Sequence, residues 1–277
     1  MRTVMFSSGA KVPVLGQGTW GMGEAAERRK EEVAALRLGL DLGLTLIDTA
    51  EMYGEGGAET VVGEAIEGRR DEVYLVSKIY PHHANRLGTV AACERSLKRL
   101  RTDRLDLYLL HWRGEVPLTE TVEAFEELKE SGAIGDWGVS NFDLSDMEEL
   151  LTVPDGEAVA TDQVLYNLYH REPETALLPW CLKRNIPIMA YSPIDRGRMT
   201  GDPILNEIAS RHGITPARVA LAWLLQKEGV IVVAKASRPE HVRENRAALD
   251  VHLTSGDLAE LEEAFPAPRK PTPLKAY

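Results

Sequence analysis

Four side chains with complementary acid–base chemistry occur in the first half of the sequence. They are a carboxylate, a phenol, an ammonium and an imidazole, carried by Asp48, Tyr53, Lys78 and His111. Asp48, Lys78 and His111 each follow an apolar, β-favouring segment, and they succeed one another at intervals of roughly 30 residues, about one strand-plus-helix unit. The carboxyl ends of parallel strands meet at one rim of a β/α barrel, so this spacing predicts that the groups converge there.

Together these groups suit the donation of a proton to a substrate oxygen. A phenol with a pKa near 10 is a weak acid at neutral pH. We expect the Lys78 cation to favour the phenolate and lower the pKa of Tyr53, while Asp48 keeps the lysine charged and oriented. His111 would position the oxygen or share its proton. Each residue alone also fits a structural role, as a turn cap, a solvated strand end or a packing residue, so the prediction depends on all four.

The rest of the chain alternates between strand and helix patterns. A hairpin over residues 4–12 comes first and could plug one end of a barrel. Near-continuous apolar strands separated by amphipathic helices are typical of a parallel sheet covered on both faces, and eight such units predict a closed (β/α)8 TIM barrel. The predicted strands are 14–18, 44–47, 73–77, 105–110, 134–139, 160–164, 186–190 and 230–234, and the predicted helices are 33–43, 58–67, 87–100, 119–130, 145–151, 173–184, 203–211, 216–226 and 239–249.

An open, doubly wound sheet is the alternative to the barrel. It would be expected to carry a glycine-rich dinucleotide fingerprint after its first strand. Gly16, Gly18 and Gly21 do not supply one, because Trp20 obstructs a phosphate loop and no helix opens directly after them. The sequence therefore favours the closed barrel.

Length and composition limit the function further. The 277 residues contain 32 basic and 43 acidic side chains, and the net charge of −11 argues against nucleic acid or an anionic membrane surface as a partner. Cys93 and Cys181 are too few for a disulfide framework, and no apolar run is long enough to span a bilayer. We expect a cytoplasmic protein with reduced, buried thiols, one domain over 1–277, and a loose proline-rich tail over 266–277.

The sequence resembles the aldo-keto reductases. The resemblance extends from the N-terminal hairpin to about residue 253 and includes the four residues of the proposed proton donor. The motifs that carry it, in family order, are Gly18-Thr19-Trp20-Gly21, Asp48-Thr49-Ala50 with Tyr53-Gly54, Val76-Ser77-Lys78, His111-Trp112, Gly138-Val139-Ser140-Asn141-Phe142, Gln163, Tyr191-Ser192-Pro193 and Glu244-Asn245.

This resemblance implies a (β/α)8 barrel that binds a nicotinamide dinucleotide without a Rossmann fold and reduces aldehydes and ketones to alcohols. Tyr53 would be the general acid, Lys78 and Asp48 would tune it, and His111 would orient the carbonyl group. The implied substrate-binding residues are Trp20, Tyr80, His111 and Trp112, with Met22 as a further candidate. The implied cofactor-binding residues are Ser140, Asn141, Gln163, Tyr191, Ser192, Ile194, Lys235, Ala236, Ser237, Arg238, His241, Glu244 and Asn245.

The last predicted helix would hold the phosphate end of the cofactor. Ser237 and Glu240 have the spacing of a capping box, and a helix N-terminus with Lys235 and Arg238 beside it is an anion site. The family places the adenosine 2′-phosphate here. The chain departs from the family at Ala236, where serine is common, and at His241, where an arginine often clamps the phosphate. We expect NADPH to be preferred and NADH to be tolerated.

Two other functions compete with carbonyl reduction. His82, His83, His111 and His170 could belong to a metal-dependent hydrolase, but neighbouring loop histidines point in different directions and no HxH or HExxH motif occurs. A non-catalytic sensor that binds a nicotinamide dinucleotide would share the barrel. We expect a monomer acting on a small carbonyl compound, with no bound metal.

Overall fold

Eight parallel strands close into a barrel in the computed structural model, which describes all 277 residues. Around the barrel the strands follow the order β10-β3-β4-β5-β6-β7-β8-β9, so each strand pairs with its neighbour in sequence and β10 closes on β3. This confirms the predicted (β/α)8 fold. The strands are β3 Leu15–Gly18, β4 Leu46–Asp48, β5 Tyr74–Ile79, β6 Leu105–Leu110, β7 Ile134–Ser140, β8 Asp162–Leu165, β9 Ile188–Tyr191 and β10 Val230–Lys235.

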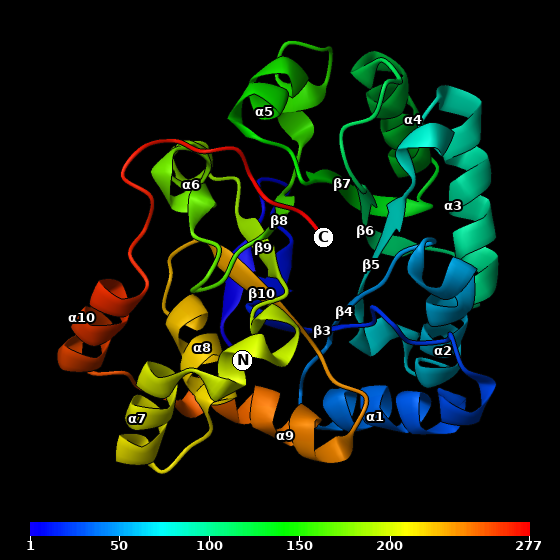
Figure 1. The fold of residues 1–277 in the computed structure, drawn as a ribbon. Helices are drawn as coiled ribbons and strands as arrows, with labels where there is room; N and C mark the ends of the chain where they lie inside the picture. The colour runs from blue at the N-terminus through cyan, green and yellow to red at the C-terminus, as the bar shows by residue number, and fades with distance from the viewer.

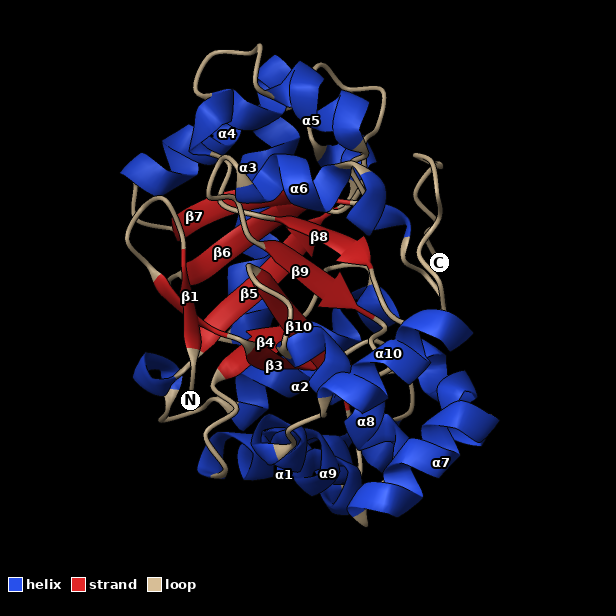
Figure 2. Ribbon diagram, turned by 90° about the vertical axis from the view of Figure 1, so that its left-hand side faces the viewer, coloured by secondary structure: helices blue, strands red, loops and turns tan.

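Helices surround the barrel on its outside (Figures 1 and 2). Most strand pairs are joined by one helix, whereas α7 and α8 both lie between β9 and β10. The apolar faces of the surrounding helices pack on the outer side of the strands in a single large core. The helices are α1 Arg29–Asp41, α2 Gly57–Ala65, α3 Arg86–Leu100, α4 Leu118–Glu130, α5 Leu144–Leu150, α6 Leu177–Leu182, α7 Pro203–His212, α8 Pro216–Leu225, α9 Pro239–Ala247 and α10 Ser255–Ala264.

An antiparallel hairpin covers the N-terminal end of the barrel. It consists of β1 Thr3–Met5 and β2 Lys11–Pro13, and Val4 pairs with Val12. Phe6 and Val12 are buried and join a second apolar cluster formed by inward-facing side chains of the barrel. The expected plug is therefore present, and the barrel interior at this end is packed with side chains.

The inward-facing rows of the strands change from apolar to polar toward the carboxyl ends. Leu46, Val76 and Leu109 belong to the apolar cluster inside the barrel. Because side chains two positions apart in a strand face the same way, the next members of these rows point inward as well. The polar residues that continue five of the rows at the C-terminal rim are Asp48, Lys78, His111, Tyr191 and Lys235.

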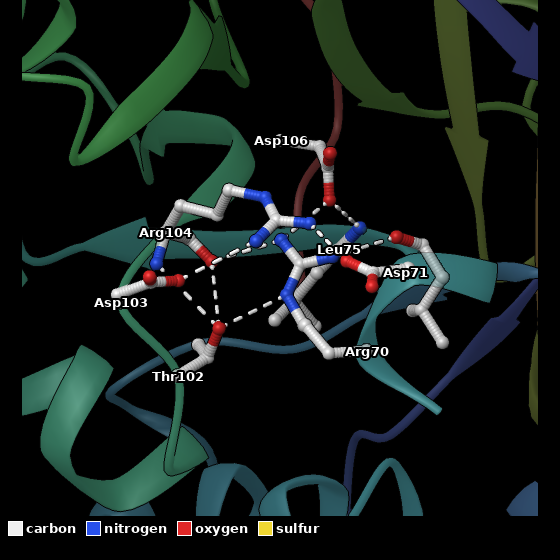
Figure 3. Close-up of polar contacts among 8 residues, drawn as sticks. Arg70, Asp71, Leu75, Thr102, Asp103, Arg104 and Asp106 are labelled. Atoms are coloured by element: carbon white, nitrogen blue, oxygen red, sulfur yellow. Dashed lines mark hydrogen bonds and ion pairs between the residues drawn. The ribbon is translucent and has the colours of Figure 1, made fainter. Parts of the chain in front are cut away.

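At the opposite end, arginine–aspartate pairs join β5 and β6 (Figure 3). Arg70 pairs with Asp106 at 2.8 Å, and Arg104 pairs with Asp71 at 2.6 Å. Asp106 also accepts a hydrogen bond from the backbone N–H of Leu75. This network fixes the start of β5, which carries Lys78, and of β6, which His111 follows, and every arginine in it already has an anionic partner.

Three elements differ from the sequence-based prediction. The helix expected over 33–43 is α1, which begins at Arg29 and ends at Asp41. The single helix expected over 173–184 is a 3₁₀ turn at Glu172–Thr175 followed by α6, because Pro179 lacks the N–H that a continuous helix would need there. Helix α10 was not predicted, although Thr254 and Asp257 form a capping box at its start. Strand bounds otherwise shift by one or two residues. No helix in the structure has both the length and the apolar character required to cross a bilayer.

Candidate active site

Lys78 lies at the centre of the converging polar groups. Its Nζ atom is 2.8 Å from both carboxylate oxygens of Asp48, 2.9 Å from the carbonyl oxygen of Thr49 and 3.3 Å from the hydroxyl of Tyr53. The lysine side chain is fully buried, and that of Asp48 is only 4% exposed. All three ammonium hydrogens therefore have acceptors, and one of these acceptors is the phenolic oxygen.

A tight turn after β4 brings Tyr53 to Lys78. Gly54 and Glu55 both adopt left-handed backbone conformations, with φ of 57° and 52°, which reverses the chain between β4 and α2. The Tyr53 ring then lies edge-on to the His111 imidazole, with the ring centroids 5.7 Å apart. The structure thus brings together all four residues predicted from the sequence.

Electrostatics at the tetrad formed by Asp48, Tyr53, Lys78 and His111 differ from the expectation in one respect. Burial raises the pKa of Tyr53, and the nearby Lys78 cation offsets this only in part. The expected net lowering is therefore wrong, because desolvation of the phenolate outweighs the attraction of the ammonium. Burial is the largest influence on Lys78 and opposes its charge, but Asp48 and Tyr53 together outweigh burial, and the pKa of Lys78 is raised. The resting pair is a neutral phenol and an ammonium ion.

His111 is neutral. Burial, together with the Lys78 charge, holds the pKa of His111 well below its usual value. Its Nδ1 atom is buried and has no hydrogen-bond partner, and its carbonyl oxygen accepts from the Asn141 side chain at 3.0 Å. A neutral imidazole can orient a carbonyl oxygen without adding charge, so the positioning role fits better than the sharing of a proton.

A cavity of about 900 Å³ opens above the tetrad. It extends from Trp20, Tyr53 and His111 to Lys235 and Asn245, so one end meets the tetrad and the other meets α9. Of the residues predicted to bind cofactor or substrate, those that line the cavity are Trp20, His111, Trp112, Ser140, Asn141, Gln163, Tyr191, Ser192, Ile194, Lys235, His241, Glu244 and Asn245.

Five predicted residues do not line the cavity. Met22 is fully buried in the outer core, so it cannot face a substrate. Tyr80 is not part of the lining but packs edge-on against the lining residue Trp112, with 5.9 Å between ring centroids. Ala236, Ser237 and Arg238 lie next to the cavity residues Lys235 and His241 without being part of its lining.

Amide and hydroxyl groups are concentrated beside the tetrad. Gln163 donates from Nε2 to Asp48 at 2.9 Å, which links it directly to the tetrad. Asn141 accepts from the Tyr191 hydroxyl at 2.9 Å and donates to Ser140 at 3.1 Å. These groups offer donors and acceptors side by side, which is what recognition of a carboxamide requires.

The distant end of the cavity carries the basic groups. Lys235 donates to the Ser237 hydroxyl at 3.2 Å, and Arg238 contacts Nε2 of His241 at 2.9 Å. The predicted capping box is wrong: α9 begins at Pro239, so Arg238 takes the N-cap position and no side chain caps the helix. Ser237 is thereby available to Lys235 at the rim of the cavity.

Some lining residues were not identified from the sequence. Thr215, Pro216 and Ala217 form the start of α8, and Ala276 and Tyr277 belong to the C-terminal tail. A threonine N-cap followed by proline marks the start of α8, but nothing local relates that position to the cavity. The tail has no strand or helix pattern from which its path could be read.

Two of the histidines considered for a metal centre lie next to one acid each: His83 is 3.0 Å from Glu51, and His170 is 3.8 Å from Asp195. No group of three or more His, Cys, Asp or Glu side chains is placed to hold a metal ion. His82 and His83 contact the Tyr80 ring. Cys93 and Cys181 are both buried and unpaired, as expected.

The fold and the site define a β/α-barrel enzyme equipped to transfer a proton to a small molecule in a rim cavity. Comparison with known proteins gives the family. Residues 14–265 match the model of the aldo/keto reductase family. The chain belongs to that family.

Several known proteins are similar to this chain over almost its whole length. The methylglyoxal reductase YeaE of Escherichia coli strain K12 is 52% identical over 99% of this chain and 98% of its own length. An aldo/keto reductase from Klebsiella pneumoniae, solved in complex with NADP and acetate, is 51% identical, with a TM-score of 0.97 over 100% of this chain and 99% of that one. A Klebsiella pneumoniae aldo-keto reductase solved with NADPH has a TM-score of 0.96 and 52% identity, at the same coverage of both chains.

Proposed function

We propose that this protein reduces small aldehydes and ketones to alcohols with NADPH, and that Tyr53 donates the proton. The observation that carries the proposal is the position of the Tyr53 hydroxyl: it lies at the end of the cavity and 3.3 Å from the buried ammonium of Lys78. Membership of the aldo/keto reductase family supports the same reaction.

The tetrad performs the proton transfer. A substrate carbonyl oxygen accepts hydrogen bonds from the Tyr53 hydroxyl and from the neutral His111. As negative charge develops on that oxygen, the phenolic proton moves to it, and Lys78 stabilises the phenolate left behind. Asp48 keeps Lys78 charged in a fully buried position, which would otherwise favour the neutral amine.

The cavity residues fit a nicotinamide dinucleotide. When bound, the reduced nicotinamide supplies the hydride that adds to the carbonyl carbon. Ser140, Asn141 and Gln163 would hold its carboxamide, and Tyr191 would pack on the ring. These four side chains surround the same end of the cavity as Tyr53, so the proton donor and the hydride donor meet there.

The basic groups at the other end of the cavity support NADPH as the preferred cofactor. Lys235 and Arg238 provide positive charge beside Ser237, although burial lowers the pKa of Lys235. Nε2 of His241 is already engaged by Arg238, which leaves this histidine a weaker phosphate ligand than an arginine. NADH should therefore be accepted with lower kcat/KM. A preference for NADH would contradict this assignment.

We propose small 2-oxoaldehydes as a substrate class. The relative from Escherichia coli is named for methylglyoxal, and it matches this chain over almost its full length. The half-exposed Trp20 and Trp112 line the cavity, and such an apolar aromatic lining also favours a broad range of small carbonyl compounds.

One assay tests the proposal against the sensor alternative. Purified protein is given NADPH and a panel that includes methylglyoxal, aromatic aldehydes and simple ketones, and loss of NADPH absorbance is followed. We expect oxidation that depends on the carbonyl compound. Binding of NADPH without any such oxidation would favour a non-catalytic sensor instead.

A further inference from the structure

The C-terminal tail returns to the cavity and ends there on a buried carboxylate. In Figure 1 the red segment leaves α10, passes α6 and ends near the carboxyl ends of the strands. The Tyr277 hydroxyl donates to Asp195 and accepts from Arg198 at 2.6 Å. His170 Nε2 lies 3.3 Å from the same oxygen. Asp195 is only 3% exposed, and Arg198 also pairs with it directly at 3.0 Å.

Asp195 belongs to a loop whose backbone conformation is intrinsically unfavourable. Ser192, Asp195 and Arg196 all adopt positive φ angles, of 50°, 49° and 55°. L-residues with side chains rarely adopt this region, and the surrounding structure must hold them in it. Residues 192–197 begin the connection from β9 to α7, and five of these six residues line the cavity. The loop is therefore a strained wall of the site that outside contacts keep in place.

The tail also holds the middle of this wall. The Arg196 guanidinium lies 4.5 Å from the Trp20 ring and 4.0 Å from the Tyr277 ring. Arg196 forms no ion pair, and its main contacts are the two aromatic faces. Trp20 comes from the loop after β3, and Arg196 thus bridges the two sides of the cavity when Tyr277 covers it.

We propose that Tyr277 is a positioning residue that latches the loop 192–198 across the cavity and thereby controls entry and release of the dinucleotide. Its hydroxyl secures Asp195, and its ring secures Arg196. This inference rests on the proposed function for the identity of the ligand. The latch itself, however, is a property of the protein alone and can be measured without any cofactor.

The first measurement is amide hydrogen exchange of residues 192–201 in protein without cofactor, comparing the parent with Tyr277→Phe and Tyr277→Ala. The Phe variant loses the bonds to Asp195 and Arg198 but keeps the ring over Arg196. We expect amide exchange of this loop to accelerate roughly tenfold. This factor corresponds to the weaker hydrogen bonds to charged groups, because Tyr277 is 48% exposed and its bonds are partly solvated. Tyr277→Ala should accelerate it further.

The matched control is Tyr169→Phe. Tyr169 is similarly exposed and its hydroxyl bonds to Asp202 at 3.1 Å, but it does not line the cavity. Its substitution should leave exchange of the loop at the parent rate. Equal exchange in the parent and Tyr277→Phe, or equal acceleration in Tyr277→Phe and Tyr169→Phe, would overturn the latch.

The second measurement is stopped-flow binding of NADPH. If the loop gates the cavity, Tyr277→Phe should speed association and dissociation together by about the same factor as the exchange, leaving Kd nearly unchanged. Faster loop exchange with unaltered NADPH rates would refute the gating role. Absence of NADPH binding by the parent protein would instead refute the proposed function, while the exchange result would still stand.

Discussion

The ammonium nitrogen of Lys78 lies 3.3 Å from the phenolic oxygen of Tyr53, although the two residues belong to different βα units. The contact forms because Lys78 continues an inward-facing row of β5, while the left-handed turn after β4 folds Tyr53 over the rim. A buried cation beside a phenol does little for the neutral acid but stabilises the phenolate once the proton has left. The pair is therefore suited to proton donation during the reaction.

The pH dependence of reduction follows from the directions of the pKa shifts. The pKa of Tyr53 is raised above 10.0, so the phenol stays protonated through the neutral range and reductive kcat at saturating NADPH should hold up to about pH 9. The pKa of His111 lies well below 6.5, so it should cause no break near that pH. Alcohol oxidation, which needs the phenolate, should rise with pH. A reductive profile with a break between pH 6 and 7.5 would contradict these assignments.

Asp48→Asn should destabilise the protein strongly. It leaves the fully buried Lys78 ammonium without its anionic partner, and breaking a buried pair in this way costs about 3–5 kcal/mol. The matched control is Asp71→Asn, which removes a partner of Arg104 at 2.6 Å from a site that is 91% exposed, and should cost about 1 kcal/mol or less. Urea unfolding of both variants measures the difference. Equal costs would show that burial of the Asp48 pair has no energetic consequence.

Asp162→Asn should stabilise the protein at neutral pH. Burial raises the pKa of Asp162 well above its usual value, and one of its oxygens has no hydrogen-bond partner. A carboxyl that binds its proton more tightly when folded costs stability as pH rises above the unfolded pKa, and the cost vanishes below that pKa. The gain in Tm should therefore grow from pH 4 to pH 7, at about 2–4 °C for each kcal/mol. A gain that is independent of pH would point to packing instead.

His241→Arg should strengthen discrimination between the two cofactors. The histidine lines the cavity beside Arg238, and a guanidinium at this position can bind a phosphate with two parallel hydrogen bonds. We expect about tenfold tighter NADPH binding, worth about 1.4 kcal/mol, with NADH nearly unaffected. Fluorescence titration of parent and variant with each cofactor measures the Kd values for NADPH and NADH and therefore their ratio. Equal tightening for NADPH and NADH would place the 2′-phosphate elsewhere.

The barrel and its tetrad were predictable because periodic signals carry them. Apolar strands alternating with amphipathic helices indicated eight units, and the regular spacing of Asp48, Lys78 and His111 indicated a common rim. Tyr53 was singled out as the phenol in the loop after the second of these strands, and resemblance to a family added the carboxamide-binding residues. Each of these signals depends on position along the chain, which the sequence records directly.

Other features depend on tertiary contacts that no local pattern encodes. The rise in the pKa of Tyr53 is a balance between burial and the Lys78 charge, and its sign requires the actual solvent exposure. Tyr80 looked like a lining residue but only packs edge-on against the lining residue Trp112. Tyr277 was assigned to a loose tail, whereas its hydroxyl bonds to residues 82 and 79 positions earlier. A proline-rich segment without periodicity gives no indication of where it docks.

Tyr53→Phe tests the assignment of the proton donor most directly. The substitution preserves the ring beside His111 and removes only the hydroxyl, so NADPH affinity should stay within about twofold of the parent. Loss of a positioned acid should lower single-turnover carbonyl reduction by about 10²–10⁴-fold. Retention of the parent single-turnover rate, with NADPH bound normally, would show that another group donates the proton.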